Sequence, residues 1–160
     1  MTSKTADLMT VKNCMKRHVF SIPESATIRD AAAVFVKHHI GLLPVVDEDE
    51  KPVGMVELRD LLTLELPDFV SFVEDVDFVH DFGAVETTRP STRALAKSIK
   101  TQMKDGITIP EDCGLLRAYA LMLQHNVHDI LVVTKTGKLV GIASRVDVGV
   151  AVLKAWAGVE

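Results

Sequence analysis

Residues 42–54, Leu-Leu-Pro-Val-Val-Asp-Glu-Asp-Glu-Lys-Pro-Val-Gly, return 87 positions later as residues 129–141, Asp-Ile-Leu-Val-Val-Thr-Lys-Thr-Gly-Lys-Leu-Val-Gly. The same offset matches further residues on both sides without a gap: Ile22 with Ile109, Ala31 with Ala118, His38 with His125, and Asp60 with Asp147. A one-residue gap before Ile22 then pairs Met15 with Met103. Self-similarity of this length indicates two copies of one structural unit.

Each copy is predicted to contain the order β-α-β-β-α, because short apolar runs alternate with segments of helical periodicity. In the first copy we expect strands at 20–23, 42–46 and 52–56 and helices at 28–36 and 58–64; in the second, strands at 107–109, 130–133 and 139–143 and helices at 115–123 and from Arg145. A unit of about 55 residues buries too little surface to be stable alone. We therefore predict an α/β (α+β) fold whose two sheets pack against each other about a pseudo-twofold axis.

The repeat divides the chain into repeat one at 8–64, a connecting insert at 65–95 and repeat two at 96–155. Four of the six phenylalanines lie in the insert. Phe69, Phe72, Val73 and Val76 share a helical face, which predicts an amphipathic helix. This helix could pack on its own module or on a dimer mate, or it could form a docking surface for an effector protein. Residues 91–100 are predicted to form a helix that leads into repeat two.

The strand-turn-strand Leu43-Pro44-Val45-Val46-Asp47 … Val53-Gly54, followed by Gly-x-x-x-x-x-Asp, resembles the CBS domain. Two such repeats in tandem resemble the Bateman module. The resemblance implies two candidate ligand clefts and frequent dimerisation into a flat disc of four repeats. It also implies an adenosine-containing ligand, AMP, ADP, ATP or S-adenosylmethionine, which would act as a regulatory ligand and not as a catalytic cofactor.

Residues 141–147, Gly-Ile-Ala-Ser-Arg-Val-Asp, fit the nucleotide-binding pattern of that family. Ser144 would open a helix, where unpaired N–H groups and the helix dipole favour a phosphate. Asp147 would accept hydrogen bonds from the ribose hydroxyls, and Arg145 would add positive charge. Ser-x-x-Asp is also a simple capping box, and both roles can coexist without ligand.

The other residues of this site follow from the resemblance. The opposite wall is expected to come from Thr108, Ile109 and Pro110, while His128, Asp129 and Ile130 would edge the adenine. Leu131 replaces the proline that is usual in the family, which weakens the prediction of the adenine contacts.

Repeat one is predicted to be the weaker site, formed by Ser21, Ile22, Leu42 and Asp60, because Glu57 takes the position of Ser144. A carboxylate about 5 Å from a phosphate would repel it by roughly 3 kcal/mol at an effective dielectric near 20. Asp60 could still hold a ribose, so adenosine or S-adenosylmethionine is favoured there. We expect one working nucleotide site per chain.

Composition excludes several other functions. The net charge of -4 and the pI near 5.8 argue against nucleic-acid binding and against a polybasic membrane anchor. No apolar run approaches the ~20 residues of a transmembrane helix, and the polar N-terminus leads into no signal-peptide core, so a cytoplasmic location is expected. Cys14 and Cys113 are expected to be reduced thiols. The histidines lack the spacing of a metal site, and no nucleophile or phosphate-binding motif marks an enzyme.

The sequence thus predicts a regulatory module that binds an adenosine-containing nucleotide between its repeats and that forms a homodimer. The alternative is a ligand-free module for dimerisation or for docking an unknown effector protein. An enzyme acting on a nucleotide is a third, formal possibility.

Overall fold

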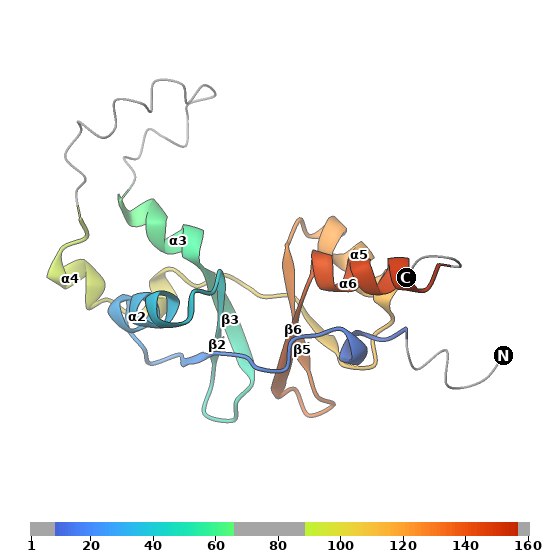
Figure 1. Ribbon diagram of the computed structural model, residues 1–160. Helices are drawn as coiled ribbons and strands as arrows, with labels where there is room; N and C mark the ends of the chain where they lie inside the picture. The colour runs from blue at the N-terminus through green and yellow to red at the C-terminus, as the bar shows by residue number, and fades with distance from the viewer. Residues whose placement is uncertain (1–8, 66–88, 157–160) are drawn as a thin grey trace, which may run out of the picture.

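The computed structural model describes residues 9–65 and 89–156. Two three-stranded sheets face each other at the centre, and helices cover the outer side of each sheet (Figure 1). The elements of the first half are η1 (Val11–Asn13), β1 (Ile22–Pro23), α2 (Ile28–His38), β2 (Leu42–Val46), β3 (Pro52–Glu57), α3 (Leu58–Leu62) and η2 (Thr63–Glu65). Those of the second half are α4 (Thr92–Leu95), η5 (Ile99–Thr101), β4 (Thr108–Pro110), α5 (Leu115–Gln124), β5 (Asp129–Val133), β6 (Leu139–Ser144) and α6 (Arg145–Lys154).

The two sheets have the same topology, with strand orders β1-β2-β3 and β4-β5-β6. In each sheet the first pair is parallel and the second pair is antiparallel. The antiparallel ladders even share an irregularity at matching places, Val45/Val46 and Val132/Val133. The predicted β-α-β-β-α repeat is therefore confirmed.

The sheets pack face to face through a small apolar layer formed by Leu42, Met55 and Leu131. Leu131 is fully buried in this layer, so the residue that replaces the expected proline contributes to the contact between the repeats. The backbone also joins the two sheets, because the Leu139 N–H donates to the Glu50 carbonyl over 3.1 Å. The predicted sheet-to-sheet arrangement is confirmed.

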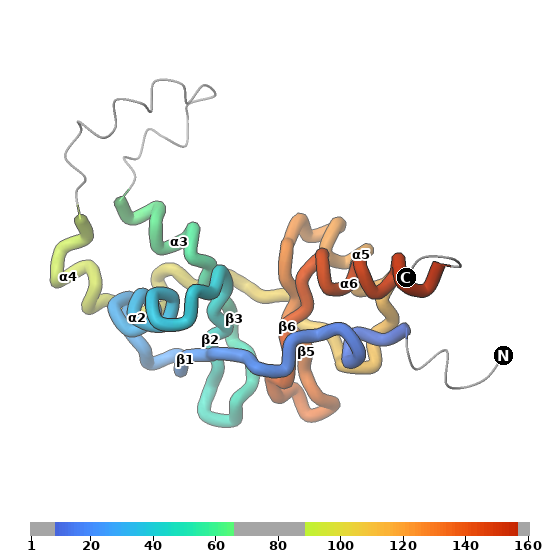
Figure 2. The backbone as a smooth tube through the Cα atoms, viewed as in Figure 1, coloured from blue at the N-terminus to red at the C-terminus, as the bar shows by residue number. Residues whose placement is uncertain are grey.

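Each repeat receives a short segment from the other half of the chain. Residues 9–16 run along repeat two before the chain crosses to β1, as the blue tube in Figure 2 shows. Lys16 pairs with Ile142 of β6 through two backbone hydrogen bonds of 2.8 and 3.0 Å. Lys104 pairs with Met55 of β3 in the same way, at 2.9 and 3.0 Å. The two hydrophobic cores are therefore interlocked, and neither consists of one continuous stretch of sequence.

Two glycines provide the space for these exchanged segments, the one around Lys16 on β6 and the one around Lys104 on β3. A Cβ on Gly141 would lie 2.5 Å from the Met15 sulfur and 3.1 Å from the Lys16 carbonyl oxygen. A Cβ on Gly54 would lie 2.5 Å from the Met103 sulfur and 2.9 Å from the Lys104 carbonyl oxygen. The glycine that opens each family motif therefore allows the exchanged segment to approach the strand.

Two local predictions differ from the structure. The helix expected at 91–100 stops at Leu95, because the following backbone bonds to repeat one: Ile28 N–H donates to Lys97 O, and Ile99 N–H donates to Ala26 O. A continuous helix would use those groups internally. The helical spacing of positions 28, 31, 32, 35 and 36 predicts that Val36 shares the buried face of α2, but Val36 is exposed. The amphipathic helix predicted around Phe69–Val76 lies outside the described residues.

Candidate functional site: the junction of the two repeats

The start of α6 carries the serine and the aspartate that the sequence singles out. Ser144 is the N-cap; its hydroxyl accepts a 3.0 Å hydrogen bond from Asp147 N–H, and the Asp147 carboxylate accepts one of 3.0 Å from Ser144 N–H. The capping box predicted as an alternative is therefore present. Both side chains remain partly exposed, so either could turn toward a ligand.

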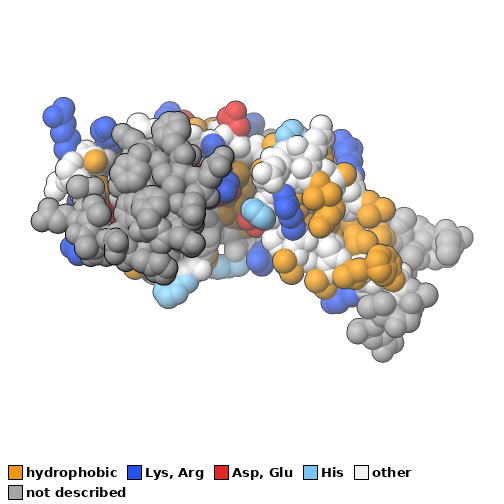
Figure 3. Space-filling view, turned by 90° about the horizontal axis from the view of Figure 1, so that it is seen from above, with side chains coloured by type: hydrophobic (Ala, Val, Ile, Leu, Met, Phe, Trp, Pro, Cys, Tyr) orange, Lys and Arg blue, Asp and Glu red, His pale blue; other side chains and the backbone are white. Residues whose placement is uncertain are grey.

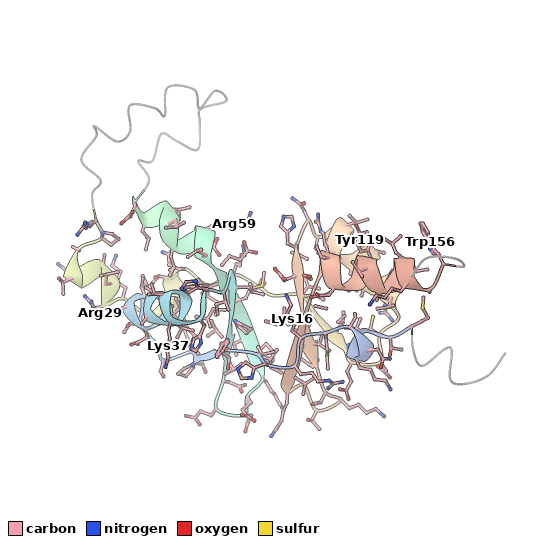
Figure 4. All side chains as sticks on the ribbon, viewed as in Figure 1. Lys16, Arg29, Lys37, Arg59, Tyr119 and Trp156 are labelled. Atoms are coloured by element: carbon pink, nitrogen blue, oxygen red, sulfur yellow. The ribbon has the colours of Figure 1, made fainter. Side chains whose placement is uncertain are left out.

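Lys16 brings a cation to this helix start from the exchanged segment. Its ammonium lies 3.7 Å from the Asp147 carboxylate, and 68% of its side chain is exposed. Figure 4 shows Lys16 at the centre of the molecule, beside the strands of repeat two. Sequence reasoning missed this residue, although the match of Met15 with Met103 also aligns Lys16 with Lys104.

A cleft of about 300 Å³ lies next to Lys16, between the two repeats. That volume is at the lower end of the range for small-molecule pockets. The repeat-one side contains residues 18–20 and 39–42, and the repeat-two side contains Asp129, Ile142 and Lys16, which pairs with Ile142. His18 and Phe20 meet edge to face with ring centroids 4.8 Å apart, and Phe20 also stacks on His38, so aromatic rings form part of the wall of the cleft.

A second groove, of about 710 Å³, runs between η1 and α6 on the outer side of repeat two. Asp147 lines this groove together with Met9, Cys14, Val150 and Lys154. Because Lys16 lines the cleft and also reaches Asp147, its side chain connects the two hollows.

The equivalent position in repeat one is a compact ion cluster. The Glu57 carboxylate contacts the Arg59 guanidinium, and it lies 3.1 Å from the Lys104 ammonium. Lys104 also lies 3.5 Å from Asp60, whose carboxylate accepts a 2.8 Å hydrogen bond from Glu57 N–H. Two carboxylates therefore hold the lysine that corresponds to Lys16.

Asp129 has an unusual environment for an acid. It begins β5, half-buried, and its backbone pairs with Ser144 in the antiparallel ladder. Burial is the largest cause that raises the pKa of its carboxyl; Glu57 and Asp147 raise it further, while Lys16 and His128 lower it. The charged form of Asp129 is therefore destabilised in the folded protein.

The structure does not direct Arg145 to a phosphate. Its guanidinium donates to the carbonyls of Val127 and Met122, over 2.8 and 3.3 Å. Met122 lies near the end of α5, so Arg145 ties α6 to the C-terminal end of that helix. The cation at the helix start is Lys16.

Most of the other predicted residues lie away from the cleft. Ile109, Ile130 and Ile22 are buried in the cores. Thr108 lines a separate cavity of about 230 Å³, Pro110 pairs with Val133 in the sheet, and Ser21 and His128 are exposed. Asp129 and Leu42 do line the cleft, although Leu42 was expected at the weaker site. Asp60 lies in the ion cluster described above.

The remaining candidate chemistry is limited. Burial raises the pKa of the free thiols of Cys14 and Cys113. Among residues 9–65 and 89–156, no group of three or more His, Cys, Asp or Glu side chains could hold a metal ion. Over the same ranges, no helix has the length and apolar character needed to cross a bilayer.

Comparison with known proteins identifies the repeat. The family model for the CBS domain matches residues 11–66 and 96–153, which is most of the chain. The chain belongs to the CBS domain family. It carries two CBS domains in tandem, and its two three-stranded sheets are those of a CBS pair.

Two curated relatives have similar sequences. An uncharacterised protein of Methanocaldococcus jannaschii, MJ1232, is 29% identical over 133 residues, which is 82% of this chain. The chloroplastic CBS domain-containing protein CBSX1 of Arabidopsis thaliana is 28% identical over 144 residues, or 87% of this chain. The matched regions span 36% and 61% of these relatives, so both proteins contain further sequence.

Solved CBS pairs have the same fold. The CBS domain protein PAE2072 from Pyrobaculum aerophilum, complexed with AMP, is 26% identical, has a TM-score of 0.64, and the match covers 94% of each chain. The CBS pair of protein MJ0100, complexed with 5'-methylthioadenosine and S-adenosyl-L-methionine, is 23% identical with a TM-score of 0.63; the match covers 88% of this chain and 92% of that one.

Proposed function

We propose that this CBS pair is a regulatory, non-catalytic module that binds an adenosine-containing nucleotide at the junction of its repeats, on the repeat-two side. One observation carries the proposal: Lys16, from the exchanged segment, places an exposed ammonium beside the start of α6, where Ser144 and Asp147 lie. The AMP complex of PAE2072 supports the ligand class. A cytoplasmic place of action stays a prediction.

The groups at this junction suit the parts of a nucleotide. A helix start with a serine hydroxyl and a nearby lysine favours an anion, as the phosphate requires. The Asp147 carboxylate suits the two ribose hydroxyls, because an ionised carboxylate accepts several hydrogen bonds. The purine would lie against the aromatic wall of His18 and Phe20 in the cleft.

Calorimetric titration of AMP into wild type, Asp147→Ala and Asp60→Ala tests this proposal. The control is matched, because each aspartate caps its helix from the equivalent position and each variant loses that cap. We expect wild type and Asp60→Ala to bind one AMP per chain, and Asp147→Ala to lose detectable binding. Equal binding by all three proteins would contradict the assignment to repeat two.

A second candidate function, assembly, has its own observation. α6 exposes an apolar stripe at helical spacing, with Val146 71%, Val150 44% and Leu153 43% exposed; Trp156, two residues beyond the helix, is 59% exposed. Seen from above, hydrophobic side chains gather over the helices of repeat two (Figure 3), and Trp156 lies at the end of α6 (Figure 4). Exposed apolar surface of this kind marks interfaces. We propose that a second copy of the chain covers this stripe in a homodimer.

Analytical sedimentation of the Val150→Asp variant tests the homodimer. Val36→Asp, the same substitution at an exposed position of α2, is the control. We expect wild type and Val36→Asp to sediment as dimers and Val150→Asp as a monomer. A monomeric wild type at micromolar concentration would contradict the dimer.

A further inference from the structure

Among the described carboxylates Glu57, Asp60, Asp129 and Asp147, which lie at the two helix starts and the cleft, Asp129 alone has no ion pair or hydrogen bond. Glu57 contacts Arg59 and Lys104, Asp60 lies 3.5 Å from Lys104, and Asp147 lies 3.7 Å from Lys16. For Asp129, by contrast, the described part of the chain offers no hydrogen-bond donor and no cation within ion-pair distance of the carboxylate, although Asp129 lines the cleft.

The position of Asp129 relates it to the proposed phosphate site. Asp129 and Ser144 are direct partners in the antiparallel pair of β5 and β6, so their side chains leave the sheet on the same face. A phosphate bound at Ser144 therefore has the Asp129 carboxylate as a neighbour. Lys16, the cation with the largest effect on Asp129, also lies beside Asp147.

We propose that Asp129 limits the negative charge that the repeat-two site accepts, so that adenosine ligands with at most one phosphate bind in preference to ADP and ATP. This proposal rests on the proposed function and deepens it. One phosphate can use Ser144, the helix start and Lys16. Each further phosphate adds charge beside a half-buried carboxylate, while the guanidinium of the neighbouring Arg145 is bonded to the Val127 and Met122 carbonyls. Like charges repel strongly where water is partly excluded.

The surroundings agree with this interpretation. Burial is the main reason that the pKa of the Asp129 carboxyl is raised; Lys16 and His128 oppose this shift, and the negative charges of Glu57 and Asp147 add to it. A polyphosphate would add to that same repulsion. Repeat one has Leu42 at the equivalent position, so the fold tolerates an uncharged residue there.

The test compares wild type, Asp129→Asn and Glu48→Gln by calorimetry with adenosine, AMP and ATP, in a buffer without divalent cations. Glu48→Gln removes the same charge from the exposed β2–β3 turn. We expect wild type to bind ATP about tenfold or more weakly than AMP, and Asp129→Asn to bind ATP about tenfold or more tightly than wild type does. Glu48→Gln should have the same ATP-to-AMP affinity ratio as wild type. Asp129→Leu, which copies Leu42, serves if the asparagine variant does not fold.

The outcomes separate this proposal from the proposed function. If AMP binds but Asp129→Asn leaves the ATP-to-AMP affinity ratio unchanged, the role of Asp129 is overturned and the nucleotide site stands. The same holds if wild type binds ATP as tightly as AMP. If wild type binds none of the three ligands, both proposals are overturned.

Discussion

The starts of α3 and α6 occupy equivalent places in the two repeats, yet they present different chemistry. In the first turn of each helix an aspartate accepts a hydrogen bond from the N-cap N–H. Each aspartate also lies near a lysine from the segment that the other half of the chain contributes, Lys104 or Lys16. In repeat one the N-cap is Glu57, and Lys104 is held by two carboxylates. In repeat two the N-cap is Ser144, and among the described residues Lys16 forms an ion pair with Asp147 alone and is mostly exposed.

This difference is the basis for proposing a nucleotide site in repeat two and none in repeat one, although the two repeats have the same sheet topology. Repulsion by Glu57 alone is not the reason, because Arg59 and Lys104 neutralise its charge. The anion-binding groups of repeat one are instead occupied by one another. A phosphate would have to break these ion pairs before it could bind, whereas in repeat two the serine hydroxyl and the lysine are accessible.

The largest expected effect comes from moving the repeat-one residue into repeat two. In Ser144→Glu the new carboxylate would lie near one lysine only, because Val146 stands where repeat one has Arg59. We expect AMP affinity to fall about a hundredfold, corresponding to roughly 3 kcal/mol for like charges about 5 Å apart. Calorimetry measures the AMP affinity of the variant. An affinity within threefold of that of wild type would contradict the proposal that the start of α6 binds the phosphate.

Alanine at Gly54 or Gly141 should affect the two repeats alike, because both glycines make room for an exchanged segment. The new Cβ would meet the Met103 or Met15 sulfur at 2.5 Å and a lysine carbonyl oxygen at 2.9 or 3.1 Å. We expect each variant to lose about 1–3 kcal/mol of unfolding free energy, the usual effect of overpacking. Urea unfolding measures this loss. Gly114→Ala, where a Cβ meets nothing within 4 Å, is the control.

Asp129 in repeat two and Leu42 in repeat one occupy equivalent positions. Their difference should affect the stability of the protein as well as nucleotide binding. Because folding raises the pKa of Asp129, its ionisation opposes folding. The protonated carboxyl of Asp129 contributes stability to the folded protein. This contribution is fully present below the unfolded pKa of about 3.9 and is lost as pH rises through the folded pKa. Asp129→Asn should therefore have a higher Tm than wild type at pH 7, and the difference should shrink toward pH 3. A lower Tm at pH 7 would contradict this assignment.

The sequence predicted those parts of the fold that depend on local pattern. The repeat at 42–54 and 129–141, together with apolar periodicity, was sufficient for the strands, the helices and the contact between the sheets. The cap of α6 could be predicted because Ser144–Asp147 has the spacing of a capping box.

What the sequence did not predict depends on contacts between distant segments. Residues 9–16 have no periodicity that predicts pairing with β6, so the sequence analysis missed Lys16. It instead assigned the wall opposite Ser144 and Asp147 to β4. Arg145 follows the serine directly, yet its guanidinium donates to the carbonyls of Val127 and Met122. Adjacency in sequence does not fix the direction of a long side chain.

The central claim is that one nucleotide binds per chain at the start of α6 and none at the start of α3. A crystal structure of the protein grown with saturating AMP tests it most directly. We predict the phosphate within hydrogen-bond distance of the Ser144 hydroxyl and the Lys16 ammonium, with the Glu57–Lys104 ion pair intact. AMP bound beside Glu57 and Asp60, or an unchanged Ser144–Asp147 pair without bound nucleotide, would contradict the account.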